Sequence, residues 1–204
     1  MRLILASSSP RRLELLRAAG FCAEPFSPDV DETPRAGEDA GELVLRLAKE
    51  KMQSVRDAHP AAWVLAADTV VVMDGAILGK PGDAAEARHM LRTLSGREHE
   101  VLTGFALGHG TQEHLQAVRT RVRFRKLGDE EIAAYVQSGE PMDKAGGYGI
   151  QAGAAHMVLA IEGSYTNVVG LPMAEVVQAL NTFGIPSGSN SALAGPADRE
   201  YIRT

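Results

Sequence analysis

The sequence predicts an α/β protein whose strands have helices on both sides of a cleft. Apolar runs typical of buried strands alternate with segments whose apolar residues recur at helical spacing. Turns that contain glycine or proline separate these segments. Because residues 1–186 contain no repeat and no clear linker, we expect them to form a single domain. Residues 187–204 are rich in serine, glycine, asparagine and alanine without periodicity, which predicts a flexible tail.

In the first half of the chain, proline, glycine and aspartate mark the boundaries of the expected elements. Pro10 suits the first position of a helix, Ser9 its N-cap, and Gly20 its end. Asp74-Gly75 is a hairpin signal, and the apolar run before it is typical of a strand buried on both faces. The expected elements are a strand over residues 2–6, a helix over 10–19, an extended segment over 21–34, a helix over 41–58, a strand over 63–73 and a return strand over 76–78.

In the second half, a capping box and glycines mark the boundaries. Asp83 and Glu86 have the spacing of a capping box, and Ser95-Gly96 ends the helix that they open. A turn at residues 108–110 separates two strands. The expected elements are a helix over residues 83–95, strands over 101–107 and 115–124, a helix over 129–136, a glycine-rich loop over 145–153, a strand over 156–161 and a helix over 172–184.

Composition excludes several classes of protein. The 204 residues carry a formal net charge of −5, which argues against a general nucleic-acid binder. No apolar run reaches the roughly 18 residues of a membrane span. The single cysteine, Cys22, excludes an intrachain disulfide framework and predicts a cytoplasmic location; beside Phe21, we expect it to fill the core. Because no aromatic platform accompanies them, we interpret the arginines that alternate along one strand as a solvated face: Arg119, Arg121, Arg123 and Arg125.

Three serines and two arginines surround the start of the first helix. The free N–H groups of a helix start, the hydroxyls of Ser7 and its neighbours, and the guanidinium groups of Arg11 and Arg12 together suit a polyphosphate. The alternative is an ordinary strand–helix unit with two solvated arginines. In an acidic chain, a polyphosphate also requires local cations, with a metal ion to offset repulsion.

Asp68 interrupts the apolar run of residues 63–73. A carboxylate at such a position is costly unless it is paired or bound to a metal ion. We expect Asp68 to end one half of the strand at the cleft, where it holds a magnesium ion, activates a water molecule, or does both. A hydrogen-bonded core aspartate is the alternative.

Weaker signals come from three other charged residues. The hairpin that ends at Lys80 brings its ammonium group toward Asp68, although a Gly-Lys-Pro turn is commonly no more than a turn. Lys51 lies on the apolar edge of its helix, where a lysine that extends to solvent is the alternative. Glu32 is one of three neighbouring acids.

Two glycine-containing segments, residues 143–151 and 164–172, suit close approach to a ligand. The amide of Gln151 at the end of the first can donate to and accept from a base edge. The six histidines have no metal-ligand spacing.

Taken together, these motifs resemble the Maf family of nucleoside triphosphate pyrophosphatases. The resemblance extends in order from Leu3 to Phe183 and covers residues 5–12, 67–71, 79–81, 95–96, 103–104, 148–151 and 167–172. It implies an inosine triphosphatase-like α/β fold with a long twisted mixed sheet, flanked by helices in two lobes around a central cleft. It also implies hydrolysis of a nucleoside triphosphate between the α and β phosphates, which releases pyrophosphate.

The resemblance also implies residue roles. Asp68 matches the catalytic proton acceptor, and Glu32 with Asp68 matches the metal-binding positions for a divalent cation, Mg²⁺ first and Mn²⁺ as the alternative. A homodimer is implied as well. Phosphate- and metal-handling positions match Ser7, Arg12, Glu32, Lys51 and Lys80.

Arg11, Thr69 and Gln151 occupy positions that separate the family's branches by substrate. All three resemble the branch that acts on dTTP and UTP in housecleaning of nucleotide pools. Ala152 departs from the pattern, because glycine usually follows the glutamine. The alternatives are the same chemistry on 7-methyl-GTP or modified nucleotides, and a non-catalytic nucleotide-binding regulator of cell division and septum formation.

Overall fold

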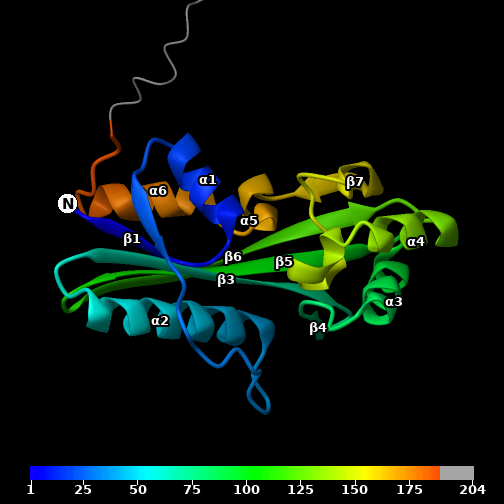
Figure 1. Ribbon diagram of the computed structural model, residues 1–204, viewed down its shortest axis with the longest axis horizontal. Helices are drawn as coiled ribbons and strands as arrows, with labels where there is room; N and C mark the ends of the chain where they lie inside the picture. The colour runs from blue at the N-terminus through cyan, green and yellow to red at the C-terminus, as the bar shows by residue number, and fades with distance from the viewer. Residues whose placement is uncertain (189–204) are drawn as a thin grey trace, which may run out of the picture.

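The computed structural model describes residues 1–188, which form a mixed seven-stranded sheet with helices on both faces (Figure 1). The α/β class predicted from the sequence is therefore confirmed. In chain order, the elements are β1 (Leu3–Ala6), α1 (Pro10–Ala18), β2 (Ala23–Phe26), α2 (Ala40–Ala58), β3 (Trp63–Met73), β4 (Ala76–Leu78), α3 (Ala84–Leu94), β5 (Glu98–His109), β6 (Gln112–Phe124), α4 (Asp129–Gln137), three short 3₁₀ turns (Glu140–Asp143, Ala145–Gly147 and Ala155–Met157), β7 (Val158–Glu162), α5 (Tyr165–Val169) and α6 (Met173–Thr182).

The pairing of β3 leaves part of its edge open. The strands lie in the order β2-β1-β3-β5-β6-β7, with β4 also paired to β3. On one side, β3 pairs with β5 over residues 64–72; on the other, β1 stops opposite Ala66 and β4 starts opposite Val71. Among the described residues, no strand therefore covers the edge of β3 at residues 67–70. Ligand sites in α/β sheets commonly form just beyond the ends of parallel strands, and this gap lies just beyond β1.

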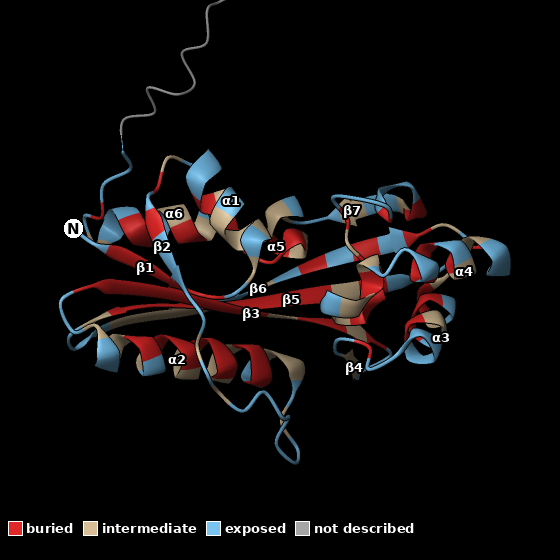
Figure 2. Ribbon diagram, in the orientation of Figure 1, coloured by how far each residue is buried: buried red, intermediate tan, exposed pale blue. Residues whose placement is uncertain are grey.

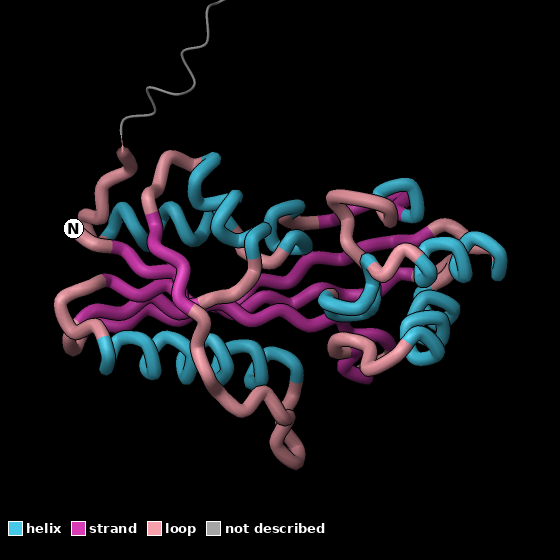
Figure 3. The backbone as a smooth tube through the Cα atoms, in the orientation of Figure 1, coloured by secondary structure: helices cyan, strands magenta, loops and turns pink. Residues whose placement is uncertain are grey.

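Helices cover the two faces of the sheet unequally. α2 lies along one face, α1, α5 and α6 lie on the other, and α3 and α4 lie toward the end where β7 is (Figure 1). The buried side of α2 faces the sheet, while its outer side is exposed (Figure 2). The long strands continue through both halves of the molecule (Figure 3). α2 contacts β5 so closely that a Cβ atom on Gly104 would lie 2.5 Å from the carbonyl oxygen of Val44.

Several predicted boundaries are confirmed. The Asp83 side chain caps α3 as predicted, but the Glu86 carboxylate accepts from the N–H of Gly82, so the predicted capping box forms only in part. A reciprocal capping box that was not predicted, formed by Asp39 and Glu42, opens α2. The predicted hairpin at Asp74-Gly75 has positive φ at both residues, 51° and 78°, as a type I′ turn requires.

Other local predictions were wrong. Asp68 does not interrupt its strand, because β3 continues through Met73 with Asp68 opposite Gly104. Ser9 does occupy the predicted N-cap position of α1, but its side chain makes no capping hydrogen bond; its backbone N–H donates to Ser7 Oγ at 3.2 Å. Cys22 is exposed, because Phe21 and Ala23 point into the core and the intervening side chain of an extended segment points away.

The second half of the chain differs mainly in length. β5 and β6 are longer than predicted, so their turn falls at residues 110–111, and the short helix α5 was not predicted. The prediction of a solvated arginine face is confirmed for Arg119, Arg121 and Arg123, which are exposed. Arg125 is partly buried and donates a hydrogen bond to Glu131.

The predicted tail, residues 187–204, lies almost entirely outside the described residues. Of its described part, Gly188 donates a backbone hydrogen bond to the carbonyl oxygen of Gly20 at 2.8 Å. Within residues 1–188, every helix is too short or too polar to cross a membrane.

Candidate active site

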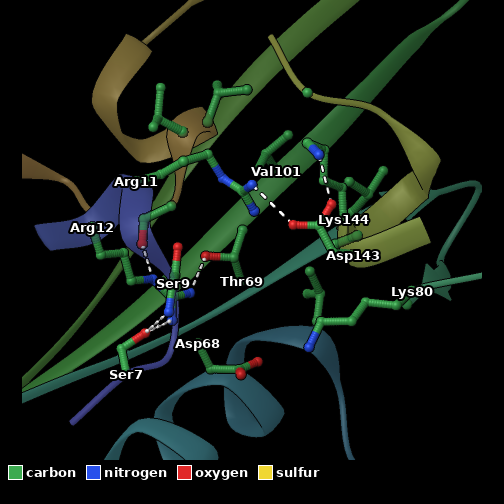
Figure 4. Close-up of a pocket in the computed structure, with 18 of the residues that line it drawn as sticks. Ser7, Ser9, Arg11, Arg12, Asp68, Thr69, Lys80, Val101, Asp143 and Lys144 are labelled. Atoms are coloured by element: carbon green, nitrogen blue, oxygen red, sulfur yellow. Dashed lines mark hydrogen bonds and ion pairs between the residues drawn. The ribbon is translucent and has the colours of Figure 1, made fainter. Parts of the chain in front are cut away.

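A cavity of about 800 Å³ opens at the uncovered edge of β3. Its walls come from the loop after β1, the start of α1, the inner side of α2 and the segment between α4 and β7 (Figure 4). Because the edge is open, side chains from both faces of β3 reach the cavity. The structure brings every residue of the predicted site to it: Ser7, Arg11, Arg12, Glu32, Lys51, Asp68, Thr69, Lys80 and Gln151.

Lys51 lies between two carboxylates. Its Nζ atom is 2.6 Å from Asp68 Oδ1 and 2.6 Å from Glu32 Oε1, and Lys51 and Asp68 are both buried. Lys80 Nζ lies 3.9 Å from the second oxygen of Glu32. Partial burial acts to raise the pKa of Glu32, but the hydrogen bond and charge of Lys51, with Lys80 and Arg12, more than offset it and lower that pKa. Glu32 therefore remains ionised at neutral pH.

Arg12 is held mainly by the protein itself. Its guanidinium group donates to the carbonyl oxygens of Gly170 and Ala67, to Ser7 Oγ and to Thr69 Oγ1, at 2.7 to 3.2 Å. Burial lowers the pKa of Arg12, and the negative charge of Asp68 counters part of that effect. An arginine has five N–H bonds, so these four contacts leave one for a ligand. Arg12 thus organises the end of β3 as well as carrying charge.

Arg11 connects α1 to the opposite wall of the cavity. Its Nη1 atom lies 3.1 Å from Asp143 Oδ2, and Lys144 Nζ lies 2.6 Å from Asp143 Oδ1 (Figure 4). Partial burial raises the pKa of Asp143, but hydrogen bonds from Lys144 and Arg11 more than offset this and hold that pKa below its usual value. The ion pair joins residues that are far apart in the sequence and spans the cavity.

The glycine-rich segment takes its shape from close contacts. Gly146 has a φ of 67°, and a Cβ atom there would lie 2.8 Å from Val71 Cγ2, so only glycine fits. Glu140 accepts hydrogen bonds from the Tyr135 hydroxyl at 3.0 Å and from the backbone N–H of Gly153 at 3.0 Å. These bonds fix the turn that presents Gln151 at the cavity wall.

A buried histidine supports another wall. His99 Nε2 lies 2.7 Å from the hydroxyl of Tyr148, which lines the cavity. Burial lowers the pKa of His99 to about 4, so the ring is neutral at pH 7. Burial also raises the pKa of Tyr148.

Sequence reasoning assigned no role to several supporting residues. Asp143 and Tyr148 stood in motifs that drew attention, but nothing identified their partners. His99 lies between Glu98 and Glu100, before the strand expected over residues 101–107, so the local sequence held no signal of its burial. The supporting residues are Glu140, Asp143, Lys144, Tyr148, His99 and Thr103.

The donor set of this site suits a hard cation only in part. Glu32 and Asp68 both contact the Lys51 nitrogen, so the two carboxylates face the same part of the cavity. Among residues 1–188, no group of three or more histidine, cysteine, aspartate or glutamate side chains gathers to hold a metal ion. Two carboxylates fit Mg²⁺, which usually takes one or two from the protein and completes its shell with water and substrate phosphates.

Comparison with known proteins identifies the family. The solved structure of the Staphylococcus aureus Ham1 protein aligns over 61% of this chain and 72% of that chain, with a TM-score of 0.45 and 13% identity. Three relatives bear the name dTTP/UTP pyrophosphatase. That of Geobacter metallireducens is 52% identical, covering 90% of this chain and 96% of its own. The Symbiobacterium thermophilum protein is 54% identical, covering 91% of this chain and 95% of its own. The Myxococcus xanthus protein is 52% identical, covering 90% of this chain and 93% of its own. The family model for Maf-like protein matches residues 2–183, and the chain therefore belongs to the Maf family.

Proposed function

We propose that this protein hydrolyses dTTP and UTP between the α and β phosphates, releasing the nucleoside monophosphate and pyrophosphate, and so acts in housecleaning of nucleotide pools. The observation that supports this best is the gathering of cations and carboxylates on one cavity at the open edge of β3: Arg12, Lys51, Lys80, Glu32 and Asp68. The names of the relatives support the choice of substrates.

In the proposed reaction, Asp68 accepts a proton from the attacking water. Lys51 bonds to Oδ1 of Asp68 and fixes the carboxylate, which leaves Oδ2 for the water. The water oxygen bonds to the α phosphorus as the bond to the bridging oxygen breaks, and pyrophosphate leaves with that oxygen. Lys80, largely exposed, and the remaining N–H of Arg12 stabilise the charge that develops on pyrophosphate.

Glu32 and Asp68 would hold the divalent cation, with Mg²⁺ first and Mn²⁺ as the alternative. When bound, the ion supplies charge neutralisation for the phosphates and acidifies a bound water. Lys51 keeps the two carboxylates together and limits their repulsion, because its ammonium group contacts both.

Arg11, Thr69 and Gln151 would contact the base. Arg11 is oriented by Asp143, Thr69 by Arg12, and Gln151 by the turn that Glu140 stabilises. Ala152 lines the same cavity next to Gln151, so its methyl group would narrow the base site.

Pyrophosphate release tests the proposal. We expect release from dTTP and UTP with Mg²⁺, and a loss of 10²-fold or more, a typical order for such a role, in Asp68→Asn. Asp57→Asn is the matched control, because Asp57 is exposed on α2, and it should keep full activity. Activity above about a tenth of wild type in Asp68→Asn would exclude Asp68 as the base.

The choice of nucleotide separates the alternatives. Release from 7-methyl-GTP but not from dTTP or UTP would mean that the base-contacting residues are wrongly assigned. Binding of nucleotide without release from any of them would favour the regulator of cell division.

We also propose a homodimer that acts in the cytoplasm. Two large apolar side chains on neighbouring elements, Leu159 of β7 and Tyr165 of α5, are exposed and could form a subunit contact. Light scattering should give twice the chain mass of 21.7 kDa. A single-chain mass would contradict the dimer.

A further inference from the structure

A line of buried hydrogen bonds leads from the cavity into the protein. Thr69 of β3 and Thr103 of β5 are opposite each other in the strand register, and their Oγ1 atoms are 2.9 Å apart. Thr103 Oγ1 lies 3.0 Å from the carbonyl oxygen of Asn167, and Arg12 Nη2 lies 3.0 Å from Thr69 Oγ1. Thr103 is completely buried and does not line the cavity, whereas Thr69 does.

The positions of the hydroxyl protons in this line follow from the number of protons that its oxygen atoms carry. A threonine hydroxyl has one proton, a carbonyl oxygen has none, and arginine only donates. Two oxygen–oxygen contacts of 2.9 and 3.0 Å each need one proton. The Thr103 hydroxyl must donate its proton to the carbonyl oxygen of Asn167, because that oxygen carries no proton. The Thr69 hydroxyl must then donate its proton to Thr103 Oγ1.

The far end of the line is fixed. The Asn167 side chain, completely buried, donates from Nδ2 to the carbonyl oxygen of Val101 and to Thr120 Oγ1, both at 3.0 Å. Its backbone N–H donates to Ser164 Oγ at 3.2 Å. With Asn167 held on three sides, its carbonyl oxygen stays in reach of Thr103.

Thr69 consequently has no proton left for a ligand. Its oxygen donates inward to Thr103 and accepts from Arg12, which leaves one lone pair. Thr69 can therefore act toward the cavity only as an acceptor. Uracil and thymine carry an N–H donor at N3, whereas cytosine carries an acceptor there.

We propose that Thr103 is a positioning residue for substrate selection: it fixes the Thr69 hydroxyl as an acceptor, so the site favours uracil and thymine nucleotides over cytosine nucleotides. This inference rests on the proposed function. Two facing acceptors repel, and a site built to bond a donor rejects an analogue that lacks it by large factors. Thr103 acts through Thr69 and does not touch the base itself.

The test is the ratio of kcat/KM for UTP to kcat/KM for CTP. Wild type should favour UTP by about 10²-fold or more. Thr103→Val is nearly isosteric but cannot accept the Thr69 proton, which is then free to point into the cavity, so the ratio should fall about tenfold. Thr103→Ser restores the hydroxyl and should restore the ratio. Thr69→Val removes the acceptor altogether, so kcat/KM for UTP should fall and the repulsion of CTP should be lost, and both effects lower the ratio.

Thr120→Val is the matched control. Thr120 is as buried as Thr103 and also bonds to Asn167, but it does not contact Thr69. Without the Thr120 hydroxyl, Asn167 keeps its bonds to Val101 and Ser164, so the ratio should stay unchanged. Thermal unfolding of each variant checks that it is folded.

The outcomes are distinguishable. A folded Thr103→Val protein with the wild-type ratio overturns the proposal, and so does a wild-type protein that hydrolyses UTP and CTP equally. If Thr103→Val does not fold, Thr69→Val decides, because an unchanged ratio there also overturns it. A wild-type protein that releases no pyrophosphate from UTP refutes the proposed function instead.

Discussion

Replacement of Lys51 by methionine should destabilise the protein, because the two carboxylates that Lys51 contacts lose their counter-charge. Lys51 Nζ contacts Glu32 and Asp68 at 2.6 Å each, and the side chains of Lys51 and Asp68 are only 8% and 12% exposed. Removing one partner of a buried ion pair costs about 3–5 kcal/mol, because the other charge stays buried without compensation. Glu32 is 49% exposed, so its share is small after solvent screening. We therefore expect a loss of about 3 kcal/mol from the Asp68 contact.

Thermal unfolding measures this loss. For a domain of this size, 1 kcal/mol shifts Tm by about 2–4 °C, so Tm should fall by about 6–12 °C in Lys51→Met. Adding Asn at position 68 should recover part of the loss, because the double variant Lys51→Met/Asp68→Asn no longer buries an unpaired carboxylate. Mg²⁺ should raise the Tm of Lys51→Met more than that of wild type, because a cation can then replace the ammonium group between the carboxylates.

Lys49→Met is the matched control on the same helix. Lys49 pairs with Glu113 at 3.3 Å and is 43% exposed, so its loss should cost under about 1 kcal/mol. If Lys51→Met unfolded within about 1 °C of Lys49→Met, the contacts of Lys51 would not stabilise the folded protein, and the reasoning would be refuted.

Three further changes test the supports of the site. Burial lowers the pKa of His99 to about 4, so between pH 6.5 and 4 the unfolded chain binds a proton that the folded chain does not. Between pH 7.5 and 5, the free energy of unfolding should therefore fall by about 2 kcal/mol more in wild type than in His99→Gln, measured by urea unfolding. Equal losses in the two proteins would contradict this. Gly104→Ala places a methyl group against the carbonyl oxygen of Val44, so it should lower the free energy of unfolding by about 2 kcal/mol and lower activity by shifting α2. An unchanged Tm and unchanged activity would count against the close packing. Asp39→Ala removes the capping bond to Glu42 and should cost about 1 kcal/mol without changing kcat, and a fall in kcat at full stability would point to a different role for Asp39.

Local patterns in the sequence predicted most of the fold. The apolar periodicity of α2, the proline at the start of α1 and the hairpin residues before β4 act on neighbouring backbone, so their effect is visible within a few residues. The predictions that were wrong concern side chains whose burial depends on tertiary packing. Cys22 lies next to Phe21 in the sequence but on the opposite side of an extended chain, so adjacency to a core residue gave the wrong burial.

The residues of the candidate site could be chosen from the sequence, but their contacts could not. A carboxylate in the apolar run of β3 required a partner, and the sequence left open whether that partner was a metal ion or a side chain. In the structure the partner is Lys51, which periodicity placed on an apolar helix edge and the family resemblance matched to a phosphate- or metal-handling position, without either showing its contact with Asp68. Arg12, expected to be a free phosphate ligand, uses most of its donors on the protein.

By itself, the sequence determined most of the element order, the α/β class and the residue types that surround the cavity, because these depend on periodicity, turns and the cost of burying charge. Only the tertiary structure decided that β1 stops and β4 starts on either side of residues 67–70, which opens one edge of β3. It alone placed Thr103 behind Thr69 and Asp143 against Arg11. Such contacts join segments distant in sequence, and they depend on strand pairing and helix packing across the whole sheet.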